Sequence, residues 1–329
     1  MSEKDNVTID FMRKDENFAD AFNFNIFDGK PVIKPENLTS VDTVVLSFPE
    51  NKGKKAKSIK KYRDVVKFLS IKRDEFASYV IFAIENQSEI HYAMPVRSLM
   101  YDLMQYESQI REIEARHHER LLKDKNYKMT SSEYLSGFTK KDKLKPVITL
   151  VINFSGKPWD GPTSLEEMIE PGNETFLKFM PVYSLNLIDP FRIKRGGFKK
   201  FSSHLKEILL YLKYASDKNQ LRKMLHKEKE FNQTPNEVVK VINTLTGSKI
   251  KIDEKKGKTD MCKAIEDLMK DSERKGERKG ERKGALKAIE MLYKLKLPFK
   301  QIVASIIDSF GYSEKKAIKE IRSLYPNFS

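Results

Sequence analysis

The sequence predicts an α/β fold, and three segments in the first half of the chain predict it. Residues 79–84 (YVIFAI) and 147–152 (VITLVI) are short, strongly apolar runs, as expected of buried strands. Between them, residues 94–120 carry apolar side chains at the three- and four-residue spacing of an amphipathic helix. A strand, a helix and a strand in this order favour a right-handed crossover and a partly parallel sheet.

Two elements are expected ahead of that helix. Residues 15–26 predict a helix because Phe18, Ala21, Phe22 and Ile26 fall near helical spacing, and Asp28 with Gly29 supplies its end. Residues 64–87 predict a β-hairpin, in which DVVKFLSI and YVIFAIENQ flank the polar turn KRDEFAS.

The register of this hairpin decides whether two acids meet. If the turn centres between Asp74 and Glu75, paired positions sum to 149 and Asp64 lies opposite Glu85. Opposed residues point to the same face of the sheet with Cβ atoms about 5 Å apart. A shift of one residue would separate them, and a strand-end ion pair or two surface acids remain the alternative to a functional site.

The predicted helix 94–120 has two faces. Its apolar stripe is expected to face the core and comprises Val96, Leu99, Met100, Leu103, Met104, Ile110 and Ile113. Its other side carries polar and aromatic residues spaced by four, Arg97, Tyr101, Gln105 and Gln109.

The second half of the chain predicts helices. Residues 1–190 are expected to form the α/β core and residues 191–250 a helical extension of it. Residues 251–329 form a charged tail, in which residues 273–284 repeat ERKG three times before a small terminal helical unit. Each glycine costs a helix about 1 kcal/mol relative to alanine. The repeat therefore predicts a solvated linker, with a helix that packs closely along its glycines as the alternative.

Composition favours a polyanionic partner and a reducing compartment. The chain has 329 residues, a formal net charge of +15 and a pI near 9.4, which is typical of proteins that bind nucleic acid. Residues 53–63 contain a basic cluster and no acid: Lys54, Lys55, Lys57, Lys60, Lys61 and Arg63. We expect this cluster either to be a solvated loop or to contact DNA phosphates. No apolar run approaches the roughly 20 residues that cross a bilayer. One cysteine, Cys262, allows no internal disulfide and favours the cytoplasm.

Two converging carboxylates predict a divalent cation. Asp64 and Glu85 would repel each other unless a cation lay between them, and oxygen ligands suit Mg²⁺. Such an ion activates water and stabilises the charge that develops when a phosphodiester is attacked. The five histidines lack metal-ligand spacing with a cysteine pair, and the chain has no phosphate-binding glycine loop.

Several longer motifs resemble one family. YRDVVK, IENQSEIHYAMPVRSLMYDLMQYESQ and LSGFTKKDKLKPVITLVINFSGKPWDGPTSLEEM are among the matching segments, which extend over roughly residues 15–225. They are similar to the bacterial recombination-promoting nuclease and transposase family, also called YhgA-like, within the PD-(D/E)XK nuclease group. The resemblance implies a restriction-endonuclease-like mixed sheet flanked by helices, and a Mg²⁺- or Mn²⁺-dependent DNA endonuclease linked to recombination or mobile elements.

The resemblance also implies roles for particular residues. Asp64 and Glu85 would bind the metal, with the carbonyl of Asn86 completing its shell. The lysine that the group usually carries two residues after the glutamate is Gln87 here, which offers only hydrogen bonds at a catalytic position. The alternative function is therefore a weak or inactive DNA-binding protein that keeps the nuclease fold.

Four further residues are expected near the metal. Asp20 would approach as an additional acid, while Arg97, Tyr101 and Gln109 would support the site or contact phosphate. An exposed helix face is the alternative for the last three. Association into homodimers, the cleavage sequence and the role of the ERKG repeat stay open.

Overall fold

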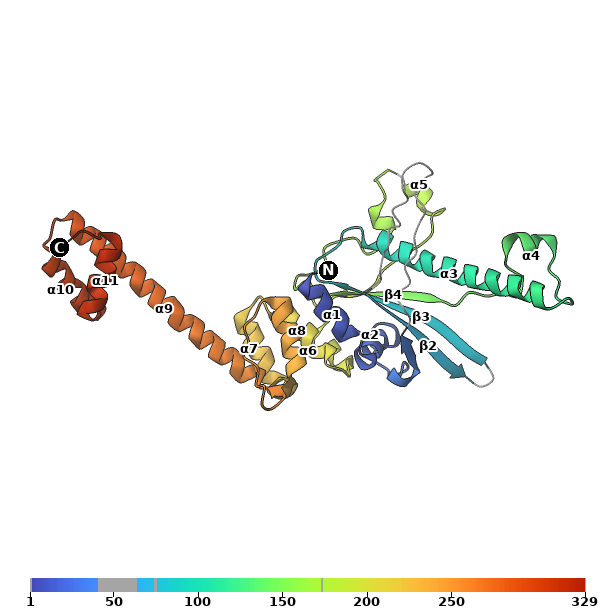
Figure 1. The fold of residues 1–329 in the computed structure, drawn as a ribbon, viewed down its shortest axis with the longest axis horizontal. Coiled ribbons are helices and arrows are strands. Elements are labelled where there is room, and N and C mark those ends of the chain that lie inside the picture. Colours follow the sequence, from blue (N-terminus) through green and yellow to red (C-terminus); the bar gives the residue numbers. More distant parts are fainter. Residues whose placement is uncertain (1, 41–63, 74–75, 173, 329) are drawn as a thin grey trace. The chain divides into compact units, whose positions relative to one another are not determined.

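The chain forms two compact units. The computed structural model describes residues 2–40, 64–73, 76–172 and 174–328 (Figure 1). Unit 1 spans Met1–Thr259 and unit 2 spans Asp260–Ser329. The two segments expected as the core and its helical extension therefore share one unit, and the division falls close to the expected boundary at residue 251.

Unit 1 contains a sheet and most of the helices. Its helices are α1 (Glu3–Met12), α2 (Asp15–Phe27), α3 (Met94–Lys123), α4 (Ser131–Ser136), α5 (Glu174–Leu177), α6 (Leu205–Tyr214), α7 (Lys218–Lys227) and α8 (Asn236–Thr246). Its strands are β1 (Leu38–Ser40), β2 (Val65–Arg73), β3 (Phe76–Gln87), β4 (Val147–Asn153), β5 (Asn186–Ile188), β6 (Thr234–Pro235) and β7 (Lys258–Thr259). Among the described residues, no helix has the length and apolarity to span a membrane.

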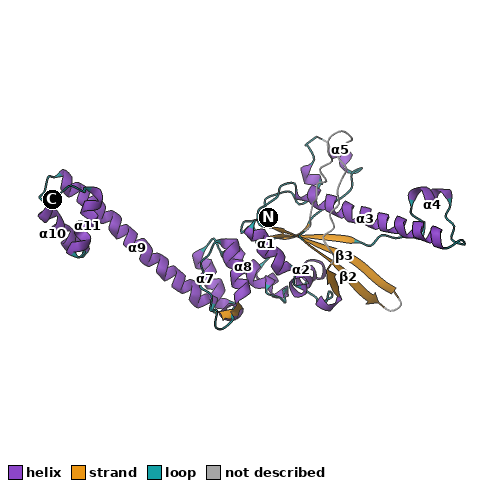
Figure 2. Cartoon of the chain, in the orientation of Figure 1, coloured by secondary structure: helices purple, strands orange, loops and turns teal. Residues whose placement is uncertain are grey.

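The main sheet is mixed, as predicted. Its strand order is β1-β2-β3-β4-β5, in which β3 pairs antiparallel with β2 and parallel with β4. Figure 2 shows β2 and β3 side by side. The hairpin pairs Arg73 with Phe76 and Val65 with Ile84, so paired positions sum to 149. These pairs confirm the predicted register.

Helices cover the two faces of β3. On one face, the ring of Phe82 lies 4.3 Å from that of Phe22 in α2. On the other face, Ile81 and Ala83 pack beneath Tyr106 of α3. Side chains that alternate along a strand point to opposite faces, so positions 81, 83, 85 and 87 of β3 share the face that packs against α3.

Helix α3 buries residues from both of its predicted sides: Met104 and Ile113 of the apolar stripe are buried, as expected, but so are residues of the polar side. Tyr101 and Gln109 are buried, whereas Val96 and Leu103 from the expected core stripe are 44% and 57% exposed. The polar side faces inward because it has partners there: the Asp102 carboxylate accepts hydrogen bonds from the hydroxyls of Thr149 and Tyr183.

Unit 2 is helical. It comprises α9 (Met261–Lys294), α10 (Phe299–Phe310) and α11 (Glu314–Leu324). The ERKG repeat lies within α9 and residues 273–283 are exposed, so the segment is solvated, as expected, but it is helical. The end of the repeat packs against the terminal helices: Arg282 bonds Glu320 at 2.9 Å, and a Cβ on Gly284 would stand 3.4 Å from Phe310. Gly276 and Gly280 have no such neighbour among the described residues, so close packing applies to the last glycine.

Candidate active site

Asp64 and Glu85 meet at the end of the hairpin. The pairing of Val65 with Ile84 puts Asp64, one residue before β2, opposite Glu85. The Asp64 carboxylate accepts the backbone N–H of Asn86 at 2.7 Å, and the Glu85 side chain is fully buried. The turn sequence thus brings two carboxylates to one face of the sheet, the face covered by α3.

Arg97 is the cation that the structure brings to this pair. It lies one turn into α3, with Nη2 3.5 Å from Oε2 of Glu85, and its guanidinium stands over the ring of Tyr101 at 5.6 Å. Tyr101 is itself buried and so limits where Arg97 can go. Of the residues expected to support the site, these two are brought to it.

The environment makes ionisation of Asp64 unfavourable. Burial raises its pKa to about 6, and the negative charge of Asp5 adds to that effect. The N–H of Asn86 and the positive charge of Arg97 act in the opposite direction. Asp64 therefore has a pKa of about 6, and perturbed pKa values of this kind are common at functional sites.

Asp5 is an acidic neighbour that the sequence reasoning missed. It lies in the first turn of α1, where it forms a capping box with Ser2. Its carboxylate accepts a hydrogen bond from the Ser88 hydroxyl at 2.6 Å, just beyond the end of β3. The pattern SEKD could have indicated a helix start at residue 2, but no local signal shows that α1 packs at the end of β3.

Asn86 and Gln87 complete the strand end on opposite faces. Gln87 shares the face of Glu85 and is 6% exposed, so it is the hydrogen-bonding side chain next along that face. The side-chain amide of Asn86 is buried, and within the described residues its oxygen and nitrogen have no hydrogen-bond partner. A buried amide of this kind costs about 1–3 kcal/mol unless a ligand or water satisfies it.

Asp20 and Gln109 have other roles. Both Asp20 carboxylate oxygens accept hydrogen bonds from the backbone N–H groups and hydroxyls of Ser202 and Ser203, which anchor the start of α6. Gln109 lies three turns along α3 from Arg97, about 18 Å away, and bonds the backbone of Lys145. The expectation that these two residues join the metal site is therefore corrected.

The carboxylate oxygens of this site are the type of ligand that binds a hard divalent cation. Mg²⁺ commonly takes one or two carboxylates and keeps several waters, and Asp64 and Glu85 offer two carboxylates on one face. Among the described residues, no group of three or more His, Cys, Asp or Glu side chains could hold a metal ion. A cation would thus bind through the pair and water, and Arg97 would have to move away from Glu85.

The expected DNA-contacting cluster lies outside the described residues. It comprises Lys54, Lys55, Lys57, Lys60, Lys61 and Arg63.

Comparisons of the chain with protein-family models, with curated proteins and with solved structures gave no match.

Proposed function

We propose that this protein is a Mg²⁺-dependent DNA endonuclease that hydrolyses phosphodiester bonds at Asp64 and Glu85. The observation that carries the proposal is the hairpin register, which sets the two carboxylates opposite each other beneath α3. The formal net charge of +15 supports a polyanionic substrate.

Each residue of the site would have a distinct role in catalysis. Asp64 and Glu85 would hold the metal, which when bound supplies an activated water and positive charge for the attacked phosphate. Arg97, once released from Glu85, can bind phosphate oxygens through its planar guanidinium. It would supply the positive charge that a lysine at position 87 would otherwise bring, while Gln87 can orient water or phosphate by hydrogen bonds.

A second candidate function is DNA binding without cleavage. The ion pair between Arg97 and Glu85 favours it, because this pair already neutralises one of the two metal-binding carboxylates. Gln87 favours it too, since an amide carries no charge to stabilise the transition state. Cleavage and binding must therefore be measured separately.

Plasmid cleavage tests the leading proposal. Supercoiled plasmid is incubated with the full chain in Mg²⁺, Mn²⁺ or EDTA, and nicked and linear products are quantified. We expect cleavage in either metal, none in EDTA, and a loss of at least about 100-fold in Asp64→Asn and Glu85→Gln.

The matched control is Asp10→Asn, which removes an exposed carboxylate of α1 paired with Arg13 and should cleave like the wild type. Equal nicking by wild type and Asp64→Asn would refute the proposal, and so would cleavage that persists in EDTA. Binding without cleavage in any metal would select the second candidate.

A further inference from the structure

Helix α7 exposes a basic surface that the candidate active site does not use. Its sequence, KNQLRKMLHK, contains four lysine or arginine residues and no acid. Leu221, Met224 and Leu225 face inward and are buried. The exposed side consists entirely of polar and basic residues, Lys218, Asn219, Gln220, Arg222, Lys223, His226 and Lys227. We call this side the α7 basic surface.

The acids that flank α7 are already engaged. The Asp217 carboxylate caps the helix by accepting the N–H groups of Asn219 and Gln220. Beyond the other end, Glu228 and Glu230 both pair with Lys206, at 3.4 and 2.7 Å. These carboxylates have cationic or N–H partners of their own, and α7 itself contains no acid that would offset the charges of Lys218, Lys223 and Lys227.

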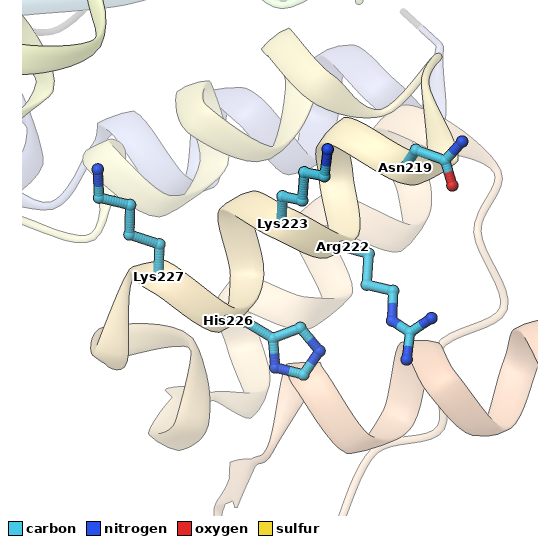
Figure 3. A pocket seen from close by; sticks show the side chains of 5 residues that line it. All are labelled: Asn219, Arg222, Lys223, His226 and Lys227. Atoms are coloured by element: carbon cyan, nitrogen blue, oxygen red, sulfur yellow. The ribbon is translucent and has the colours of Figure 1, made fainter.

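The cations stand in rows along the helix. Lys223 and Lys227 are four residues apart and therefore follow one another on the same face, about 6 Å apart along the axis. Figure 3 shows them extending to one side of α7, while Arg222 and His226 extend to the other side and Asn219 lies at the start of the helix. All five line one hollow in the surface.

We propose that the α7 basic surface binds the phosphate backbone of duplex DNA. This inference deepens the proposed function, on which it rests for the choice of DNA as the partner. A ten-residue helix is about 15 Å long, and phosphates of one DNA strand advance about 3.4 Å each, so the helix spans on the order of four phosphates. Lysine side chains reach phosphates without reading bases, so the contact positions the duplex irrespective of sequence.

The chemistry of the surface favours a duplex over other anionic partners. An interfacial helix inserts apolar side chains into a membrane, but the apolar side chains of α7 are buried in unit 1. Binding to single strands relies on aromatic side chains that stack on bases, and α7 contains no aromatic residue other than His226. Rows of cations suit the regular phosphates of a duplex.

The test measures DNA binding in EDTA, so that cleavage does not enter. A fluorescein-labelled duplex is titrated by anisotropy at several salt concentrations with the full chain. The test variant is Lys218→Gln/Lys223→Gln/Lys227→Gln. The matched control is Lys125→Gln/Lys128→Gln/Lys143→Gln, which removes three exposed lysines from the region beyond α3 and lowers the formal net charge of +15 equally. Circular dichroism checks that both variants fold.

The α7 variant should bind at least about tenfold more weakly than the control, and its plot of log affinity against log salt should be shallower by about 2 to 3. Equal binding by the two variants would overturn the α7 proposal and leave the nuclease proposal intact. If the α7 variant binds the duplex more weakly and the wild type shows no cleavage in the separate plasmid assay, the α7 proposal is supported and the nuclease proposal is refuted. Tighter wild-type binding to single-stranded RNA or to phosphatidylserine vesicles than to the duplex would overturn the choice of partner.

Discussion

The two halves of helix α3 both turn polar side chains inward, but they differ in how those groups are compensated. In the first half, Arg97 faces the buried Glu85, and the nearby Asp64 has a pKa raised by burial. In the second half, Gln109 exchanges two hydrogen bonds with the backbone of Lys145. Neutral groups that match donor to acceptor hold a fold together. Buried charges at one strand end are less completely compensated, so a ligand that compensates them can bind there with a gain in electrostatic free energy.

The largest expected effect comes from removing the cation of the first half. Arg97→Met takes the guanidinium away from the buried Glu85 carboxylate and should lower the free energy of unfolding by about 3 kcal/mol. Adding Glu85→Gln should restore most of the loss, because the neutral amide needs no counter-charge. Urea unfolding followed by fluorescence measures this in unit 1, since Trp159 is the only tryptophan and is buried there.

The control for this prediction is another arginine of α3. Arg111 pairs with Glu107 at 2.9 Å, but both side chains are more than half exposed. Arg111→Met should therefore change the free energy of unfolding by no more than about 0.5 kcal/mol. Equal losses in the two variants would show that burial does not distinguish the two pairs.

The next largest effect concerns Asp64, where a substitution is expected to stabilise the folded chain at pH 7 and not to destabilise it. The pKa of Asp64 is about 6 in the folded chain against an ordinary 3.8, so between these values the folded state binds more protons than the unfolded state. The free energy of unfolding should therefore fall by roughly 2 kcal/mol as the pH rises from about 4 to 6 and Asp64 ionises. Asp64→Asn cannot ionise and should be more stable than the wild type at pH 7, with the difference shrinking toward pH 4.

Urea midpoints at a series of pH values measure this, with Asp10→Asn as the exposed control on α1. A variant that is destabilised at pH 7 and unchanged in its pH dependence would refute the raised pKa. In the same pH range, Mg²⁺ binding by the wild type should strengthen as Asp64 ionises, which calorimetric titration can follow.

Local sequence was sufficient for the hairpin and the carboxylate pair. The polar turn residues set the register of β2 and β3, and apolar runs separated by a helix indicated the parallel pairing of β3 with β4. The glycines of the ERKG repeat were given too much weight, because Glu, Arg and Lys fill the other positions of each repeat with good helix formers.

Contacts distant in sequence were not predictable in this way. Apolar periodicity correctly predicted the burial of Met104 and Ile113 but missed the burial of the polar side of α3, because the partners of that side lie on β3 and β4 and in the loop before β4. Ser88 and Asp5 are 83 residues apart, and only the packing of α1 against β3 brings them together. Asp20 was placed at the metal because it is an acid on an early helix, yet its partners Ser202 and Ser203 come from the segment before α6.

The smallest effect should come from the second half of α3. Gln109→Ala removes the two hydrogen bonds to the Lys145 backbone, and because Lys145 is exposed, water can replace them. The free energy of unfolding should fall by only about 1 kcal/mol, and Mg²⁺ affinity and plasmid cleavage should stay at the wild-type level. Arg97→Met, by contrast, should change all three. If Gln109→Ala also altered metal affinity, the two halves of α3 would be energetically coupled. The distinction between a functional first half and a purely structural second half would then be wrong.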